Sequence, residues 1–266
     1  MNVNGIESVH VHDYISQSHS RSLSRSRFTI TFHHFMNEYL YKATDNLSAM
    51  ITAQPQLLLT LSHFGIPMGF GDKTIAQVCA AHGVEPKFFL LICEVYSNDN
   101  YSPSAATLRA TPLEGLVPYL LRSHDYYLNR RLPHIGHHLE KIADMLPARA
   151  GKAIKQFFSA YIDEVREHFI HEEKIVYPHI HRLLNRESED KFTIKSYLDT
   201  HDNLEEKLSD LVQIIFKYLP GSETNDDAID MIFDILQLSH DLRKHAIIED
   251  KILGPYVKQL EKAAKL

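Results

Sequence analysis

The stretch HFIHEEKIVYP at residues 168–178 is repeated as HAIIEDKILGP at residues 245–255, with six identical residues and two close replacements. Each copy begins with a histidine, has a glutamate four residues later and ends in a proline. Residues four apart lie on one face of a helix, so each histidine and its glutamate are expected to point the same way. The repeat therefore predicts two helices of the same kind in one domain. The two pairs are His168 with Glu172 and His245 with Glu249.

Residues 112–262 contain four long helical segments, separated by the breaker stretches MLPARAG, LNRESEDK and LPGSETND. In every segment the apolar residues follow the 3.6-residue spacing of an amphipathic helix, and a histidine lies within the apolar stripe. The pattern predicts an all-α fold, an up-and-down four-helix bundle. The stripes comprise Leu121, Tyr127, Leu128 and Ile135 around His124; Phe158, Tyr161, Ile162, Val165, Phe169, Ile175, Val176 and Ile180 around His168; Ile194, Leu198, Leu208 and Leu211 around His201; and Ile235, Leu238, Leu242 and Ile252 around His245.

The four inward histidines form two pairs with the same spacing along the chain. His124 and His168 are 44 residues apart, and so are His201 and His245. Two residues on consecutive antiparallel helices lie at one height when the turn falls midway between them. The midpoints, at positions 146, 184–185 and 223, lie in or beside the three breaker stretches. We therefore expect the four imidazoles and the two glutamates of the repeat at one level of the bundle core.

This arrangement predicts a metal site. An isolated histidine–glutamate pair on a helix is usually an exposed hydrogen-bonded pair, but burying two carboxylates among four imidazoles without a cation would cost several kcal/mol in desolvation. Iron, manganese and zinc accept these ligands. Six groups exceed the four of a closed structural zinc site, so the sequence favours two cations bridged by Glu172 and Glu249. It does not decide between iron and manganese.

The sequence allows two roles for each of two further residues. Glu205 follows His201 by four residues, and either adds a seventh ligand or pairs with Lys207 on the surface. Tyr127, one turn after His124, either belongs to the core or donates a hydrogen bond to a ligand on the metal.

The remaining prolines and histidines of the bundle are given structural roles. The three prolines are expected to break or kink their helices, and to close one end of the bundle if they have a functional role. Most other histidines are expected on solvated faces, while His138 and His240 are left undecided. The prolines are Pro133, Pro178 and Pro255, and the solvated histidines are His134, His137, His171, His179 and His181.

Ahead of the bundle the chain divides into three parts. Residues 1–27 contain the Ser/Arg/His stretch SQSHSRSLSRSR and predict a flexible tail. Residues 28–98 alternate apolar helical segments with turn signals and predict a small helical domain. Residues 99–111 are polar, turn-rich and aperiodic, and predict a linker.

The composition excludes several classes of protein. The 266 residues carry a net charge of −6 and lack a basic face for nucleic acid, apart from a small cluster at Arg21, Arg25 and Arg27. No apolar run is long enough to cross a membrane. Two cysteines and the absence of a signal peptide favour the cytoplasm. The 18 histidines beside 34 acidic residues again favour metal binding.

The segments RSHDYY, HFIHEEKIVYP, THDNLEE and HAIIEDKILGP resemble the four motifs of the hemerythrin-like (HHE cation-binding) family in order, spacing and proline positions. Within this family the chain is most similar to the di-iron proteins implicated in repair of iron–sulfur clusters damaged by oxidative or nitrosative stress. Their small N-terminal domain resembles LLLTLSHFGIPMGFGDKTIAQVCAAHGVEPKFF. The resemblance implies two iron ions, bridged by oxygen or carboxylate, with manganese or zinc as alternatives. Carried over by motif position, the ligands are His124, His168, Glu172, His201, His245 and Glu249.

The sequence departs from relatives at two places. Where the repair proteins typically have a Cys-Cys pair, this chain has Gly69-Phe70, and its cysteines are Cys79 and Cys93. Where oxygen-carrying hemerythrins have a second histidine on the third helix, this chain has Glu205. On the fourth helix, Glu249 follows His245 by four residues, a closer spacing than in those proteins. A carboxylate-rich site suits redox chemistry or iron release better than reversible oxygen binding.

Three functions are compatible with this sequence. The first is a stress-response protein that repairs iron–sulfur clusters, with damaged iron–sulfur proteins as clients and oxygen, nitric oxide or peroxide as small reactants. The second is a sensor of oxygen, nitric oxide or iron that signals through its N-terminal domain. TIAQVCAAHGVEPKFF could form a helix-turn-helix, but EPKFFLLICEVY is apolar, so nucleic acid is not the expected partner. The third is an iron or zinc store. The sequence leaves catalytic turnover and a homodimer undecided.

Overall fold

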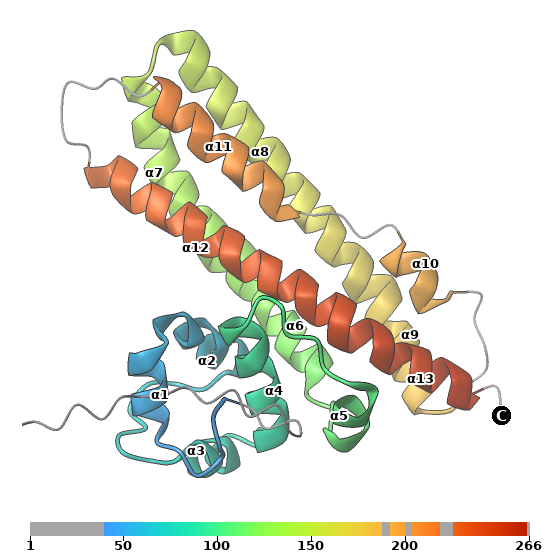
Figure 1. Cartoon of the computed structure of the whole chain (residues 1–266). Coiled ribbons are helices and arrows are strands. Elements are labelled where there is room, and N and C mark those ends of the chain that lie inside the picture. Colours follow the sequence, from blue (N-terminus) through green and yellow to red (C-terminus); the bar gives the residue numbers. More distant parts are fainter. Residues whose placement is uncertain (1–39, 188–191, 200–203, 219–225, 265–266) are drawn as a thin grey trace, which may run out of the picture. The chain divides into compact units, whose positions relative to one another are not determined.

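Four long helical segments make up the C-terminal part of the chain in the computed structural model, which describes residues 40–187, 192–199, 204–218 and 226–264 (Figure 1). The first two segments are continuous helices that contain a short π-helical stretch (η). The first comprises α6 (Leu116–Tyr126), η3 (Tyr127–Arg131) and α7 (Leu132–Met145). The second comprises α8 (Ala148–His171), η4 (Glu172–Val176) and α9 (Tyr177–Leu184).

The third segment is interrupted, whereas the fourth is again continuous. The sequence predicts one helix around His201, but α10 ends at Leu198, capped by Asp199, and α11 begins at Leu204. His201 itself lies outside the described residues. The third segment comprises α10 (Ile194–Leu198) and α11 (Leu204–Tyr218). The fourth comprises α12 (Asp226–Ile248), η5 (Glu249–Leu253) and α13 (Gly254–Ala264).

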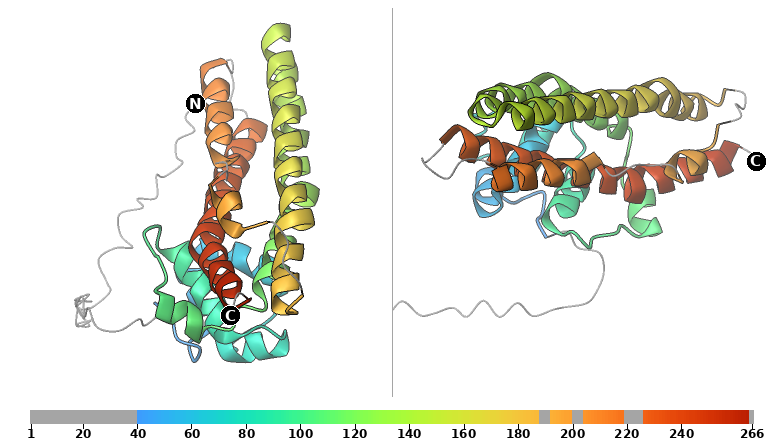
Figure 2. Two further views of the ribbon diagram at one scale, coloured as in Figure 1. Left: turned by 90° about the vertical axis from the view of Figure 1, so that its right-hand side faces the viewer. Right: turned by 90° about the horizontal axis from the view of Figure 1, so that it is seen from above.

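The long helices pack as an up-and-down bundle, and the all-α fold predicted from the sequence is confirmed. Helix α7 packs on α8 and α12, and α11 packs on α8 and α12, so each long segment contacts both of its neighbours (Figures 1 and 2). The midpoint at 146 falls in the turn between α7 and α8, and that at 184–185 falls where α9 ends. The midpoint at 223 lies between the end of α11 and the start of α12.

The prolines do not break the helices, because each follows a π turn. In all three cases the amide of the residue just before the proline bonds to the carbonyl five residues back: Leu132 to Tyr127, Tyr177 to Glu172 and Gly254 to Glu249. In a regular α-helix the proline ring would clash with the carbonyl four residues earlier and one hydrogen bond would be lost. The wider π turn accommodates the ring and lets the helix continue.

The π turns also change which side chains face the core. A π turn brings residues five apart onto one face, so Tyr177 follows Glu172 toward the interior and Ile175 is 41% exposed. Leu121, also expected in the core, is 39% exposed, and its neighbour Leu120 is buried instead. His179 is buried and not solvated as expected, because Glu261 of α13 bonds to its Nε2 at 3.1 Å.

Short helices precede the bundle and pack against it. They share a hydrophobic core with the bundle, in which Phe64 of α2 and Phe88 of α4 lie against Tyr119 of α6. The segment predicted as a linker contains the short helix α5, whose Leu108 is buried. The division into domains remains a prediction. The short elements are α1 (Leu47–Ala53), the 3-10 turn η2 (Pro55–Leu57), α2 (Leu58–Phe64), α3 (Ile75–Ala81), α4 (Pro86–Ser97) and α5 (Ala105–Ala110).

The core is divided along the bundle. One apolar cluster joins the short helices to the ends of the second and fourth segments, around Val176 and Ile248. The other fills the distal half between α7, α8, α11 and α12, around Ile135 and Ile235. Polar side chains of the repeat lie where the two clusters meet. None of the described helices combines the length and apolar character required to cross a bilayer.

Candidate metal centre

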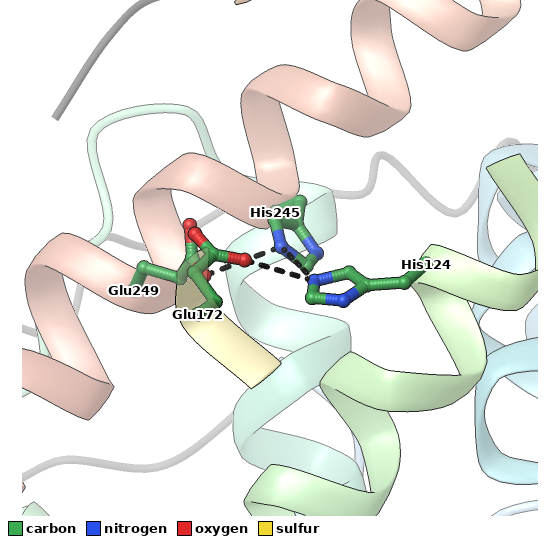
Figure 3. A group of neighbouring side chains, drawn as sticks. All are labelled: His124, Glu172, His245 and Glu249. Atoms are coloured by element: carbon green, nitrogen blue, oxygen red, sulfur yellow. Dashed lines mark hydrogen bonds and ion pairs between the residues drawn. The ribbon is translucent and has the colours of Figure 1, made fainter. Parts of the chain in front are cut away.

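Four side chains from three long helical segments converge inside the bundle (Figure 3). His124 comes from α6, Glu172 begins η4, His245 lies near the end of α12 and Glu249 begins η5. All four are at most 3% exposed, and each offers one ligand atom within 4.8 Å of the others. Two ligands of one first-row ion lie at most about 4.2 Å apart, so these atoms are spaced for one ion or two adjacent ions.

The contacts centre on the Nε2 atoms of the imidazoles. Nε2 of His124 lies 3.1 Å from Oε2 of Glu172 and 3.3 Å from Nε2 of His245. The latter is also 3.3 Å from Oε1 of Glu249 (Figure 3). Two imidazole nitrogens that face each other at this distance share either a proton or a cation. The two copies of the repeat thus contribute matching carboxylates to one place.

Both imidazoles are held through their other nitrogen. The Ser123 hydroxyl donates to the carbonyl oxygen of Leu120 at 2.6 Å, so it accepts from Nδ1–H of His245, at 2.9 Å. Nδ1 of His124 lies 3.0 Å from Oε1 of Glu173, which accepts its proton. With Nδ1–H held in this way, each imidazole directs Nε2 into the cluster, where it offers a lone pair when the ring is neutral. Metal-binding histidines are typically held in this way.

Two tyrosines complete the polar shell. The hydroxyl of Tyr197, on α10, donates to Oε1 of Glu172 at 2.5 Å, and that of Tyr177 lies 3.3 Å from Nε2 of His124. Burial, and then the charges of Glu172 and Glu249, raise the pKa of both tyrosines far above the usual 10.0, so both remain O–H donors. Sequence reasoning missed both, although the π turn places Tyr177 five residues after Glu172.

The carboxylates hold positive charge at this place. Burial alone would lower the pKa of His124, but the hydrogen bonds that it donates to Glu172 and Glu173 raise it to about 9. Burial would likewise raise the pKa of Glu172, but hydrogen bonds from His124 and His168 keep it well below the usual 4.5. A proton on His124 therefore balances part of the carboxylate charge, and a metal ion would take over that role when the imidazole is deprotonated.

The other predicted ligands lie at the edge of this cluster. Nε2 of His168 is 2.8 Å from Oε1 of Glu172, whereas His124 contacts Oε2 of the same carboxylate. Glu205 of α11 lines a small cavity of about 10 Å³ together with His168, His245 and Glu249. That volume is about the size of one water molecule or ion. His201, the sixth predicted ligand, lies outside the described residues.

Tyr127, whose ring lies 5.8 Å from that of His245 between centroids, belongs to a second polar network. Its hydroxyl lies close to the Asp241 carboxylate, which also accepts a hydrogen bond from Tyr96. Asp241 in turn lies 3.4 Å from Nε2 of His63, on α2. Burial raises the pKa of Asp241 to about 6 and lowers that of His63 to about 3. This network therefore joins α12, one turn before His245, to the short helices.

The donor set fits a divalent or trivalent first-row metal. Imidazole nitrogen and carboxylate oxygen suit iron, manganese and zinc, and no thiolate is near, since Cys79 and Cys93 are buried in the core of the short helices. The deprotonated Nε2 atoms and the two glutamates converge from different helices, so one cation would neutralise charge that the apolar surroundings cannot.

Comparison with known proteins agrees with this geometry. The model of the hemerythrin HHE cation binding domain matches residues 119–262, which include every residue of the cluster. The chain is also 21% identical over 213 residues to the Iron-sulfur cluster repair protein YtfE of Musicola paradisiaca (strain Ech703). That match covers 79% of this chain and 94% of that protein, so it extends over the short helices as well as the bundle.

Proposed function

Since the chain belongs to the hemerythrin HHE cation-binding family, we propose that its buried cluster holds two iron ions and that the protein repairs damaged iron–sulfur clusters. The observation that carries the proposal is the convergence of two Nε2 atoms and two carboxylates, with each imidazole tied at Nδ1 by Ser123 or Glu173. Similarity to a repair protein along most of both chains supports the choice of reaction.

The ligands divide into two sets in this proposal. One iron would be held by His124 and His245, and the other by His168, with His201 and Glu205 as further candidate ligands. Glu172 and Glu249 would be available to both ions, which would account for the repeated motif. When bound, iron supplies redox chemistry and a releasable ion. Zinc in its place would remove the redox chemistry, and either zinc or manganese would remove the supply of iron.

The residues around the ligands have defined tasks. Ser123 and Glu173 orient the imidazoles, and Tyr197 donates a proton in a hydrogen bond to Glu172 without taking up charge. Apolar residues on both sides, such as Phe169 stacked on His124 at 3.9 Å between ring centroids, exclude water. A small cavity beside Glu205 reaches the ligands His168, His245 and Glu249. Ions and small oxidants such as nitric oxide or peroxide would enter there.

Metal content tests the first half of the proposal. Protein purified without chelators is compared with a Glu172→Gln/Glu249→Gln variant by elemental analysis and Mössbauer spectroscopy. Two irons per wild-type chain in one coupled site, lost in the variant, are expected. A Glu167→Gln/Asp230→Asn variant, changed at exposed positions of α8 and α12, removes the same number of carboxylates and should retain both ions. A wild type that stays metal-free after anaerobic iron loading would exclude the proposal.

Repair is tested with an iron–sulfur dehydratase inactivated by nitric oxide. Iron-loaded wild-type protein is expected to restore its activity, whereas metal-free protein, the Glu172→Gln/Glu249→Gln variant and an equal amount of free ferrous iron are not. Restoration by free iron to the same extent would reduce the protein to an iron store. No restoration by the loaded wild type would reject repair while leaving the metal site standing.

A sensor is the second candidate, and one set of contacts favours it. Lys244, adjacent to the ligand His245, donates from its buried Nζ to the carbonyl oxygen of Val95 at 2.6 Å and to Asp99 at 2.5 Å. A shift of α12 on metal or ligand binding would thus reach α4. Hydrogen exchange of α4 should then differ between metal-free and iron-loaded protein. Identical exchange of α4 in the two forms would reject this candidate. Burial of most side chains of α4 already argues against a role of this helix in reading DNA.

A further inference from the structure

A second group of potential ligands lies on the outer part of the bundle. His134 and His138, one turn apart on α7, and Asp234 of α12 each offer one ligand atom, and these atoms lie within 4.8 Å of one another. The two helices pack directly against each other (Figure 1). The two imidazole rings lie 4.9 Å apart between centroids. From the sequence, His134 is expected on a solvated face and His138 is left undecided.

The group is ordered by hydrogen bonds from both helices. Oδ2 of Asp234 lies 2.7 Å from Nδ1 of His134. Asp227, also on α12, lies 3.0 Å from Nδ1 of His138, which leaves Nε2 of that ring for a cation. His138 and Asp234 are 12% and 16% exposed, whereas His134 is 56% exposed. The group is thus partly built into the helix interface and open to solvent on one side.

This group is separate from the buried cluster. His134 is ten residues beyond His124 along the same long helix, or about 15 Å at the rise of an α-helix. Asp234 lies eleven residues before His245 on the antiparallel α12, or about 16 Å. The two separations agree, so both groups bridge the same pair of helices at different levels. They share no ligand, and neither the family nor the repeat accounts for the outer group.

We propose that His134, His138 and Asp234 bind a second kind of cation, a divalent first-row transition-metal ion such as Zn²⁺, at a solvent-accessible and exchangeable site. Two imidazoles and one carboxylate suit such ions, and water fills the remaining positions. Asp227 supports the site from outside, as a carboxylate behind a metal-binding histidine typically does. This inference goes beyond the proposed function and does not depend on it.

Neighbouring charges set the strength of the site. Arg131 pairs with Oδ1 of Asp234 at 3.0 Å, and Lys141 pairs with Asp227 at 2.9 Å. Both cations offset part of the carboxylate charge, so the site should bind a metal ion more weakly than the buried cluster. That difference in strength allows the two sites to be measured separately.

The test is a Zn²⁺ titration by calorimetry of the full chain carrying Glu172→Gln/Glu249→Gln, which disables the buried cluster. We expect one Zn²⁺ per chain, with an affinity that falls at least about tenfold on adding His134→Ala, because one of three protein ligands is lost. His137→Ala is the matched control, since His137 is an exposed imidazole on the same helix but outside the group. It should leave the affinity unchanged.

Three outcomes would overturn the proposal: no Zn²⁺ bound, binding that is the same after His134→Ala, or an equal loss in the His137→Ala control. The last two would place the ion elsewhere in this histidine-rich chain. If the double glutamine background does not fold, iron-loaded wild-type protein is titrated with Zn²⁺ in its place, with and without His134→Ala. The same dependence on His134 is expected there.

Discussion

At the scale of single residues, two side chains outside the ligand set determine how the histidines are presented. Ser123 precedes His124 in the chain but bonds to His245 of another helix, and Glu173 follows Glu172 but bonds to His124. Each therefore ties one half of the cluster to the other. Neither is expected from helical spacing, since residues one apart on a helix do not share a face.

Removing these bonds should weaken metal binding without unfolding the chain. Ser123→Ala and Glu173→Gln are each expected to lower iron affinity about 10- to 100-fold, because the first removes the acceptor that orients His245 and the second replaces the charged acceptor of His124 with a weaker, neutral one. Competition with a colorimetric chelator measures the loss. Glu167→Gln, an exposed change of the same charge on α8, is the control and should keep wild-type affinity. Unchanged affinity in both variants would show that the imidazoles are oriented by packing alone.

Asp241 gives the metal-free protein a defined pH dependence. Burial raises its pKa from 3.8 to about 6 in the folded chain, so the folded state binds the proton more tightly than the unfolded state. Its contribution to the free energy of unfolding is therefore present below about pH 4 and is lost as the pH rises through about 6. Asp241→Asn removes this titration and retains a carbonyl oxygen to accept from Tyr96.

We expect Asp241→Asn to gain stability relative to wild type between about pH 4 and pH 7, by at most about 3 kcal/mol. Urea unfolding of both metal-free proteins across this range measures the difference, and titrations common to both proteins cancel. Parallel stability curves would mean that Asp241 has an ordinary pKa. Asp230→Asn, an exposed change on the same helix, should show no such divergence.

At the scale of elements, the π turns and one close helix contact define the bundle. Each π turn starts at or one turn after a residue of the cluster and ends just before a proline. Sequence periodicity assumes 3.6 residues per turn throughout, so it places Ile175 in the core and overlooks Tyr177. The proline positions are the signal that could have corrected this, since a proline within a continuous helix requires local widening.

The turn between α7 and α8 requires glycine at position 151. A Cβ built on Gly151 would lie 2.2 Å from the carbonyl oxygen of Ala143 on α7, so the backbone of one helix would have to move. We expect Gly151→Ala to lower the free energy of unfolding by about 1–3 kcal/mol, in spite of the higher helix propensity of alanine. Denaturant unfolding measures it. Ser159→Ala, exposed on the same helix, is the control and should change the free energy of unfolding by no more than about 0.5 kcal/mol. An equal effect of Gly151→Ala and Ser159→Ala would contradict the close contact between Gly151 and Ala143.

At the scale of the whole molecule, the short helices and the bundle are joined by buried polar contacts beside the cluster. Lys244→Met removes the hydrogen bonds to Val95 and Asp99. It should lower the free energy of unfolding by about 1.5–3 kcal/mol, because the donor is charged and the carbonyl of Val95 stays buried. Hydrogen exchange should accelerate most in α4. Lys258→Met, on the exposed face of α13, is the control. Faster exchange confined to α12 would show that α4 is held by apolar contacts alone.

Metal binding should stabilise the folded chain as a whole. The ligands come from helices far apart in sequence, so the unfolded chain cannot hold an ion in the same way. Iron at about 100 times its dissociation constant is expected to add about 2.7 kcal/mol per ion to the free energy of unfolding. Thermal unfolding before and after chelation measures this. The Glu172→Gln/Glu249→Gln variant should show no gain, and a gain equal to wild type would place the ions elsewhere.

The sequence by itself determined the fold class, the turns of the bundle and the convergence of the repeat. These follow from local physics: helical periodicity, breakers and equal spacing fix which residues share a face and a height. Only the tertiary structure decided which groups surround the ligands. Glu173, Ser123, Tyr177 and Tyr197 reach the cluster through contacts across helices and through π turns, whose widening alters the facing of every later residue. The outer group at His134 likewise exists only because α12 places Asp234 beside α7.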